Sequence, residues 1–229
     1  WMRAANKMKK RNWLIDGLRT LSVLMMIYYH FLFDLEFFYG KEMGLFEGYW
    51  PPVRIFFAGL FLFLSGYSTC YGTRQIRNGC ILVGWGFLIT LVTGWFTPGR
   101  GVYFGILHLM GVAQFLSYFI FRYLLPCQNF LFVLGAWFLL VMNFHYPVYL
   151  LPLGGGGQYF SMVDYFPVVP WIIPFVLGVS AGQWKILDSF TCSYGKAGGW
   201  ISWMSRHSLL VYLVHQPILF AFLWLYFGH

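Results

Sequence analysis

Charged side chains are scarce in this chain. Asp, Glu, Lys and Arg make up 10% of its 229 residues, whereas a soluble domain has about 25%. Apolar residues account for 59%, which is more apolar surface than the core of a soluble protein of this length can bury. The scarcity of charge therefore excludes an ordinary soluble domain and predicts a membrane protein that contacts the lipid bilayer.

Paired cysteines and internal repeats are also missing. The four cysteines, Cys70, Cys80, Cys127 and Cys192, show no CxxC or other paired spacing. We therefore expect buried, inert thiols and no metal site. No repeat of one half of the chain in the other is visible, which argues against a transporter built from inverted repeats.

Seven apolar runs approach the length of about 20 residues that a helix needs to cross a bilayer. They predict an all-α, polytopic membrane bundle with spans at about 13–34, 52–71, 79–96, 102–125, 129–147, 165–184 and 207–227. The run at 102–125 leaves open a broken or re-entrant helix, because its first half is rich in glycine. The basic and then apolar start lacks an A-x-A cleavage site, so we expect a retained first span. Residues 1–11 are predicted to be a basic cytoplasmic segment and 12–229 a single transmembrane domain.

Positive charge is concentrated on one predicted face of the membrane. With the N-terminus in the cytoplasm, twelve of the 15 Lys and Arg residues fall at the inner face and three at the outer face, the bias expected of a membrane protein. The net charge of +8 is thus explained without nucleic acid, which we exclude as a partner. The inner group is Arg3, Lys7, Lys9, Lys10, Arg11, Arg19, Arg74, Arg77, Arg122, Lys185, Lys196 and Arg206, and the outer group is Lys41, Arg54 and Arg100.

The first span carries a titratable pair, His30 and Asp34, in the string "MMIYYHFLFDLEFF". Four residues separate them, so they share a helix face near the predicted outer end. A carboxylate at mid-bilayer depth costs about 2.5–3.5 kcal/mol, and such groups are candidates for function. The pair favours a histidine base oriented by a carboxylate, while a polar contact between helices stays open.

Two residue pairs that contain arginine lie at predicted cytoplasmic helix ends. Arg74 and Arg77 in "GTRQIRNG" are three residues apart and could bind a phosphate group. Arg19 follows Asp16 at the same spacing near the start of the first span. Ordinary inner-face charge and a snorkelling arginine are the alternatives.

Other polar side chains interrupt the later spans. His108 lies in "YFGILHLMG", between two glycines that allow close helix packing. Asp164 and Trp171 belong to "DYFPVVPW", which predicts a rigid turn before an outer helix start and a wall of an acceptor site. His215 and Gln216 precede a proline in "SLLVYLVHQP". For His108, a hydrogen bond between helices is the alternative to a chemical role.

Five strings resemble, in the same order, bacterial members of the heparan-α-glucosaminide N-acetyltransferase catalytic-domain family. The likeness extends from about residue 12 to residue 227. The first helix is also similar to membrane acyltransferases that modify O-antigen and peptidoglycan, in which an arginine opens this helix and a histidine closes it, here Arg19 and His30. The strings are "IDGLRTLSVLMMIYYHFLFDLEFF", "FLFLSGYS", "YFGILHLMGVAQ", "DYFPVVPWIIPFVLGVSAG" and "SLLVYLVHQP".

The resemblance implies an integral-membrane acyltransferase of the bacterial cytoplasmic membrane. Acyl-CoA, typically acetyl-CoA, would be a co-substrate bound from the cytoplasm, with no permanently bound cofactor. The acyl group would pass to an amine or hydroxyl of a cell-envelope sugar on the opposite face. His30 would be the catalytic position with Asp34 as its companion. Arg19, Arg74 and Arg77 would bind acyl-CoA, and the last two would hold its phosphates. Lysosomal members have an asparagine where His30 stands, so its role follows the wider acyltransferase group.

Two mechanisms and one rival class stay open. His30 could remove a proton from the acceptor as it attacks the thioester, or could itself carry the acyl group. Donors such as His108, Gln216 or His215 could stabilise the oxyanion. The rival is a non-enzymatic membrane protein, either a small transporter or a b-type haem electron carrier whose histidines supply axial ligands. Whether the chain forms a homodimer also stays open.

Overall fold

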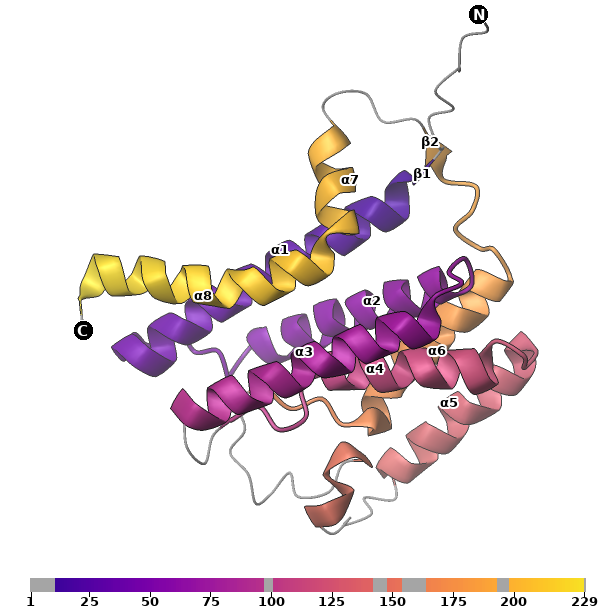
Figure 1. The fold of residues 1–229 in the computed structure, drawn as a ribbon, viewed down its shortest axis with the longest axis horizontal. Coiled ribbons are helices and arrows are strands. Elements are labelled where there is room, and N and C mark those ends of the chain that lie inside the picture. The colour runs from indigo at the N-terminus through magenta and orange to yellow at the C-terminus, as the bar shows by residue number, and fades with distance from the viewer. Residues whose placement is uncertain (1–10, 97–100, 142–147, 154–163, 193–197, 229) are drawn as a thin grey trace, which may run out of the picture. The chain divides into compact units, whose positions relative to one another are not determined.

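A computed structural model describes residues 11–96, 101–141, 148–153, 164–192 and 198–228 (Figure 1). The chain divides into two compact units, residues 1–61 with 186–229, and residues 62–185. Apart from two strands of two residues each, the regular structure of the described residues is helical, which confirms the all-α prediction. The single domain predicted for 12–229 stays a prediction. The basic segment predicted at 1–11 lies outside the described residues, except for Arg11.

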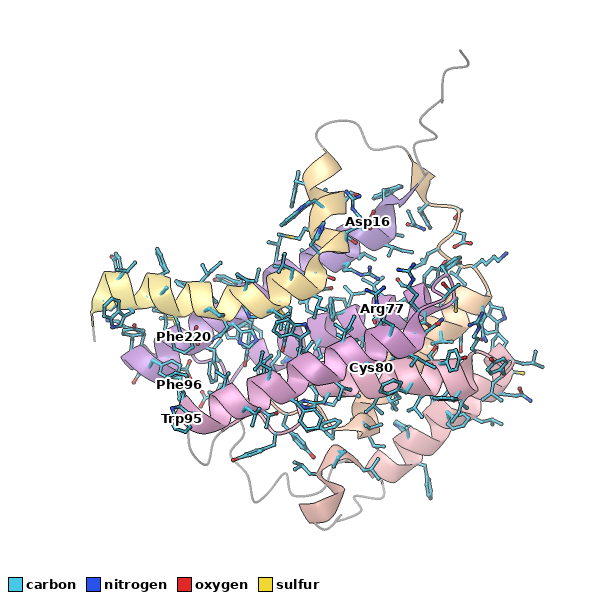
Figure 2. The ribbon with its side chains drawn as sticks, viewed as in Figure 1. Asp16, Arg77, Cys80, Trp95, Phe96 and Phe220 are labelled. Carbon is cyan, nitrogen blue, oxygen red and sulfur yellow. The ribbon has the colours of Figure 1, made fainter. Side chains whose placement is uncertain are left out.

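Within the described residues, four helices are long and apolar enough to cross a membrane: α1 (Trp13–Tyr39), α2 (Trp50–Thr69), α3 (Gln75–Phe96) and α8 (Ser208–Phe227). Trp95 and Phe96 near the end of α3 are 82% and 77% exposed (Figure 2), as expected for side chains whose solvent is lipid. The multi-pass membrane bundle is thereby confirmed. The number of spans, predicted as seven, stays a prediction, because the remaining helices are shorter.

Shorter helices occupy the other three predicted runs, whereas α7 (Gly199–Arg206) lies outside all seven. The run at 102–125 contains α4 (Ile106–Leu116) and the π-helical segment η1 (Ser117–Phe121), and its first glycine, Gly105, lies just before α4 in extended conformation. The run at 129–147 contains α5 (Pro126–Val141), with 142–147 outside the described residues. The run at 165–184 contains α6 (Val168–Gln183), which follows a non-helical turn. A 3-10 helix, η2 (Val148–Leu153), lies between α5 and α6.

The cysteine prediction is wrong for three of the four residues. Cys70, Cys80 and Cys127 are free and exposed, whereas we expected buried thiols. Although Cys70 is exposed, its thiol donates a hydrogen bond to the Val179 carbonyl of α6 at 3.3 Å. A small, weakly polar thiol is tolerated without full burial in protein. The side chain of Cys192 is outside the described residues.

In the first unit, α1 is the element on which α7 (Gly199–Arg206) and α8 pack (Figure 1). Asn12 caps the start of α1 by accepting a hydrogen bond from the Ile15 amide at 3.1 Å, and its own amide donates to the Leu187 carbonyl. Strand β1 (Arg11–Asn12) pairs antiparallel with β2 (Thr191–Cys192) beside this cap. The helix ends at Gly40, whose φ of 62° is left-handed and suits glycine. The helix is therefore five residues longer than predicted, and Asp34 lies inside it.

In the second unit, glycines allow helices to approach closely. A Cβ atom at Gly66 of α2 would lie 2.0 Å from the Phe175 carbonyl oxygen of α6, and one at Gly178 would lie 2.0 Å from the Phe63 carbonyl oxygen. No larger residue fits at either position without moving the backbone. Helix α3 packs along α4, and α5 along α6 (Figure 1). These helices carry or adjoin the predicted residues His108, Asp164 and Trp171.

Candidate active site

Helices α1 and α8 bring four predicted residues together in the first unit. His30 and Asp34 come from α1, and His215 and Gln216 from α8, which continues through its proline to Phe227. About 180 residues separate the two pairs along the chain, so their meeting depends on the packing of the two helices. We refer to His30, Asp34, His215 and Gln216 as the α1–α8 cluster.

Asp34 is bound by Gln216. The side-chain amide nitrogen of Gln216 donates to both carboxylate oxygens, at 2.8 and 2.9 Å. Because Asp34 is 0% exposed, its carboxylate needs such hydrogen bonds. Among the described residues, no hydrogen bond joins Asp34 to His30, the partner that the four-residue spacing predicted. A side chain from a second helix reaches the carboxylate instead.

His215 has one ring nitrogen bound and one unbound. Its Nδ1 lies 2.6 Å from the Tyr212 carbonyl oxygen, one turn earlier in α8. A carbonyl can only accept, so Nδ1 carries the hydrogen and Nε2 of the neutral ring has a lone pair. Both His215 Nε2 and Gln216 Oε1 are buried and have no hydrogen-bond partner among the described residues. The cluster thus presents two buried acceptors.

The rings of His30 and His215 are neighbours. Their centroids are 5.1 Å apart and their planes are tilted by 56°, and Tyr29 contacts the His30 ring edge-on. Two protonated imidazoles at this distance would repel each other, so the pair favours at most one proton. The arrangement suits a reaction in which one proton is taken up and then released.

Arg54 is a residue near this cluster that the sequence interpretation missed. It lies in the first turns of α2, is exposed, and acts electrostatically on His30. We had counted it only as outer-face charge. An arginine inside the predicted span 52–71 was the available signal, because charged residues in spans are candidates for function.

The second unit places His108 and Asp164 beside Gly105, and Trp171 is connected to this region through Phe166, whose amide donates to the Phe104 carbonyl at 3.0 Å. His108 Nδ1 accepts a hydrogen bond from the Gly105 amide at 3.3 Å, so the neutral ring carries its hydrogen on Nε2. A Cβ atom at Gly105 would lie 2.9 Å from Asp164 Oδ2, which places the carboxylate beside the same glycine. Trp171 packs on Phe166 with centroids 4.6 Å apart. We call these three residues, with Gly105, the Gly105 cluster.

His108 is enclosed by its neighbours. Its ring stacks on Phe104 at 5.4 Å and meets Phe87 edge-on at 5.5 Å. A Cβ atom at Gly86 of α3 would lie 2.9–3.0 Å from three ring atoms. This site is compatible with a packing role and with a chemical role for His108. The hydrogen bond from the Gly105 amide to Nδ1 fixes the start of α4, and the Nε2–H is left as a donor. The role of His108 in chemistry stays a prediction.

Arg74, just before α3, and Arg77, in its first turn (Figure 2), are both exposed. The turn before them is fixed by buried Gln75, whose amide nitrogen donates to the Thr69 carbonyl at 2.9 Å and the Gly72 carbonyl at 2.7 Å. Arg122, directly after η1, is a further arginine near the end of α2. It acts electrostatically on Cys70. The Ser117 hydroxyl of η1 also donates to the Thr69 hydroxyl of α2 at 3.1 Å. Sequence spacing missed Arg122 because it lies 45 residues from Arg77 along the chain.

Arg19 lies in the other unit, on α1, and is half-buried. Its neighbour Asp16 is 3% exposed and accepts a hydrogen bond from the Ser205 hydroxyl of α7 at 2.7 Å (Figure 2). Asp16 therefore joins α1 to α7. A phosphate site shared by Arg19, Arg74 and Arg77 stays a prediction. The described residues contain no group of three or more His, Cys, Asp or Glu side chains that could hold a metal ion.

Comparison with known proteins gives one match. The family model described as "Heparan-alpha-glucosaminide N-acetyltransferase, catalytic" matches residues 11–217, which include both histidine clusters and Arg74 and Arg77. Searches of curated proteins and of solved structures found no match. The family is one of transmembrane acetyltransferases, in agreement with the apolar helices and the resemblance of the sequence. The chain therefore belongs to the heparan-alpha-glucosaminide N-acetyltransferase catalytic family.

Proposed function

We propose that the protein transfers an acyl group, in the first place acetyl, from acyl-CoA to an amine or hydroxyl of a cell-envelope sugar. The donor binds from the cytoplasm, the acceptor lies on the opposite face, and the protein resides in a bacterial cytoplasmic membrane. The observation that carries the proposal is the α1–α8 cluster. A buried histidine, His215, and a half-buried one, His30, lie beside a carboxylate held by Gln216, and such groups can transfer a proton during acyl transfer. Both histidines lie in the matched family region.

The reaction needs one proton to move. The acceptor oxygen or nitrogen forms a bond to the thioester carbonyl carbon, the carbon–sulfur bond breaks, and CoA leaves as a thiolate. A histidine of the α1–α8 cluster, which the sequence predicts to be His30, takes the acceptor's proton and returns it to the thiolate. Asp34 and Gln216 form the polar wall of this site. A route through an acyl-His30 intermediate uses the same residues in two steps.

The other candidate residues serve binding in this proposal. Arg74 and Arg77 bind CoA phosphates, because exposed guanidinium groups form charge-assisted hydrogen bonds with phosphate. His108, through its Nε2–H, keeps its predicted role as an oxyanion donor, and Asp164 and Trp171 keep their predicted role in acceptor binding. A homodimer is compatible with this scheme and is not required by it.

Replacement of His30 tests the proposal. Cell-envelope glycans from a strain that lacks the gene should lack an acyl group, detected by mass spectrometry as a loss of the acetyl mass, and the wild-type gene should restore it. His30→Ala should not restore it, although the protein is still inserted and folded. His207→Ala is the matched control, because His207 is an exposed histidine. Full restoration by His30→Ala would falsify the role of His30.

A further inference from the structure

The backbone of α8 fixes the protonation of His215. The 2.6 Å contact between Nδ1 and the Tyr212 carbonyl oxygen requires a hydrogen on Nδ1, because a carbonyl cannot donate. A neutral imidazole has one such hydrogen, so Nε2 keeps its lone pair. The residue is 8% exposed, and this lone pair is therefore held in a buried position in the form that accepts a proton.

Two buried acceptors lie on successive residues. His215 Nε2 and Gln216 Oε1 have no hydrogen-bond partner among the described residues, and an unsatisfied buried acceptor is unfavourable unless a bound molecule supplies a donor. The other atoms of these side chains are occupied, Nδ1 by Tyr212 and the amide nitrogen by Asp34. The two free atoms therefore fit a ligand that carries O–H or N–H groups.

His30 differs from His215 in this respect. Its ring lies against those of Tyr29 and His215, and Arg54 acts on it electrostatically. Among the described residues no hydrogen bond fixes its tautomer. Its position beside His215 means that a proton on one ring disfavours a proton on the other. Of the two rings, His215 is the one prepared to take the proton. His30 is its neutral neighbour in the same site, so the loss of transfer expected of His30→Ala does not require His30 to be the base.

We propose that His215 Nε2 is the proton acceptor of the transfer reaction and that Gln216 Oε1 accepts a second hydrogen bond from the same sugar. This rests on the proposed function. As the acceptor's O–H or N–H bond breaks, its electron pair bonds to the thioester carbon, the carbon–sulfur bond breaks, and the proton passes to Nε2. The proton then moves to the CoA thiolate, which leaves as the free thiol, so His215 ends neutral.

A pair of acceptors tests this role. The protein is placed in nanodiscs, which expose both faces, with acetyl-CoA and either glucosamine, which has an amine and hydroxyls, or 1-thioglucose. At about pH 9 most of a thiol with an ordinary pKa of about 8.5 is ionised, so its sulfur has no proton to lose. The variant is His215→Asn, since asparagine can still donate to the Tyr212 carbonyl and removes only Nε2.

We expect His215→Asn to lower the rate with glucosamine by about 10²–10⁴-fold, the usual contribution of a general base. With 1-thioglucose the loss should stay under about tenfold, because the base is not needed. His207→Ala should leave both rates unchanged. If His215→Asn does not fold, judged by gel filtration, His215→Gln serves in its place, because its side chain reaches the Nε2 position without being a base.

The outcomes separate the two proposals. An unchanged or equally lowered rate with both acceptors in the His215 variants overturns the role of His215, while the acyltransferase function stands. If His30→Asn lowers the rate with glucosamine but not with 1-thioglucose, and the His215 variants do not, the base is His30. That result also overturns the inference. No acetyl transfer by the wild-type protein to either acceptor overturns the proposed function itself.

Discussion

His215 and His108 are both buried, and in both the Nδ1 atom is bound to the backbone, but with opposite polarity. Nδ1 of His215 donates to a carbonyl, whereas Nδ1 of His108 accepts from the Gly105 amide. The free nitrogen of His215 is therefore an acceptor and that of His108 a donor. In an acyl transfer, the first can take a proton and the second can bind an oxyanion.

The surroundings of the two histidines differ as well. His108 is packed between aromatic rings and against Gly86, so it contributes to the contact between α3 and α4. His215 has a histidine neighbour and an unsatisfied atom. Burial alone would not separate these residues, since they are 6% and 8% exposed. The backbone group that each ring binds is what separates a base from a donor.

The largest expected effect comes from the same substitution in both clusters, His215→Asn and His108→Asn. If His108 binds the oxyanion, which forms with every acceptor, His108→Asn should slow transfer to glucosamine and 1-thioglucose alike, by about 10²–10³-fold. His215→Asn should slow the glucosamine reaction alone. Initial rates with both acceptors check this, and folding is controlled by gel filtration. A His108→Asn enzyme with the wild-type rate would leave His108 with its packing role only.

Gln216→Leu tests how far Asp34 depends on its partner. Removal of the amide leaves the buried carboxylate without the two hydrogen bonds at 2.8 and 2.9 Å, which should lower the free energy of unfolding by about 1–3 kcal/mol. The double variant Asp34→Leu with Gln216→Leu should recover much of this loss, because neither polar group then remains unpaired. Thermal unfolding in nanodiscs measures both. Equal destabilisation in the single and double variants would contradict the pairing.

The long helices and the helix face of the first pair could be predicted from the sequence. Apolar runs predicted α1, α2, α3 and α8, and the four-residue spacing placed His30 and Asp34 on one face of α1. The end of α1 was predicted too early. The aromatic residues after Asp34 continue the helix, and only Gly40 ends it.

The partners of the candidate residues could not be predicted. Spacing compares residues within one helix, whereas Gln216 reaches Asp34 from a helix about 180 residues away. The Nδ1 bonds of His108 and His215 involve a backbone amide and a backbone carbonyl, which no residue type reveals. Likewise, Arg54 and Arg122 required the folded chain to be recognised as neighbours of His30 and Cys70.

A smaller effect is expected from Gly86→Ala, which tests the enclosure of His108. The added methyl group would meet three atoms of the ring at 2.9–3.0 Å, and such overpacking costs about 1–3 kcal/mol of unfolding free energy. Gly84→Ala on the same helix is the control, because nothing lies within 4 Å of a Cβ atom there. The midpoint of thermal unfolding should fall for the first variant only. Equal midpoints for Gly86→Ala and Gly84→Ala would show that the His108 ring can move away from the added methyl group and is not tightly packed.

The smallest effect is expected at the exposed arginines, which differ from both histidine clusters because water and lipid headgroups reach them. Arg77→Gln removes one charge-assisted contact to a CoA phosphate, which in an exposed position is worth about 1 kcal/mol, or roughly a fivefold rise in KM for acetyl-CoA with kcat unchanged. Lys41→Gln is the control, since Lys41 belongs to the predicted outer face. Because phosphate contacts are screened by salt, the difference between Arg77→Gln and wild type should shrink as ionic strength rises. A fall in kcat at unchanged KM would instead place Arg77 in the transfer step, together with the buried histidines.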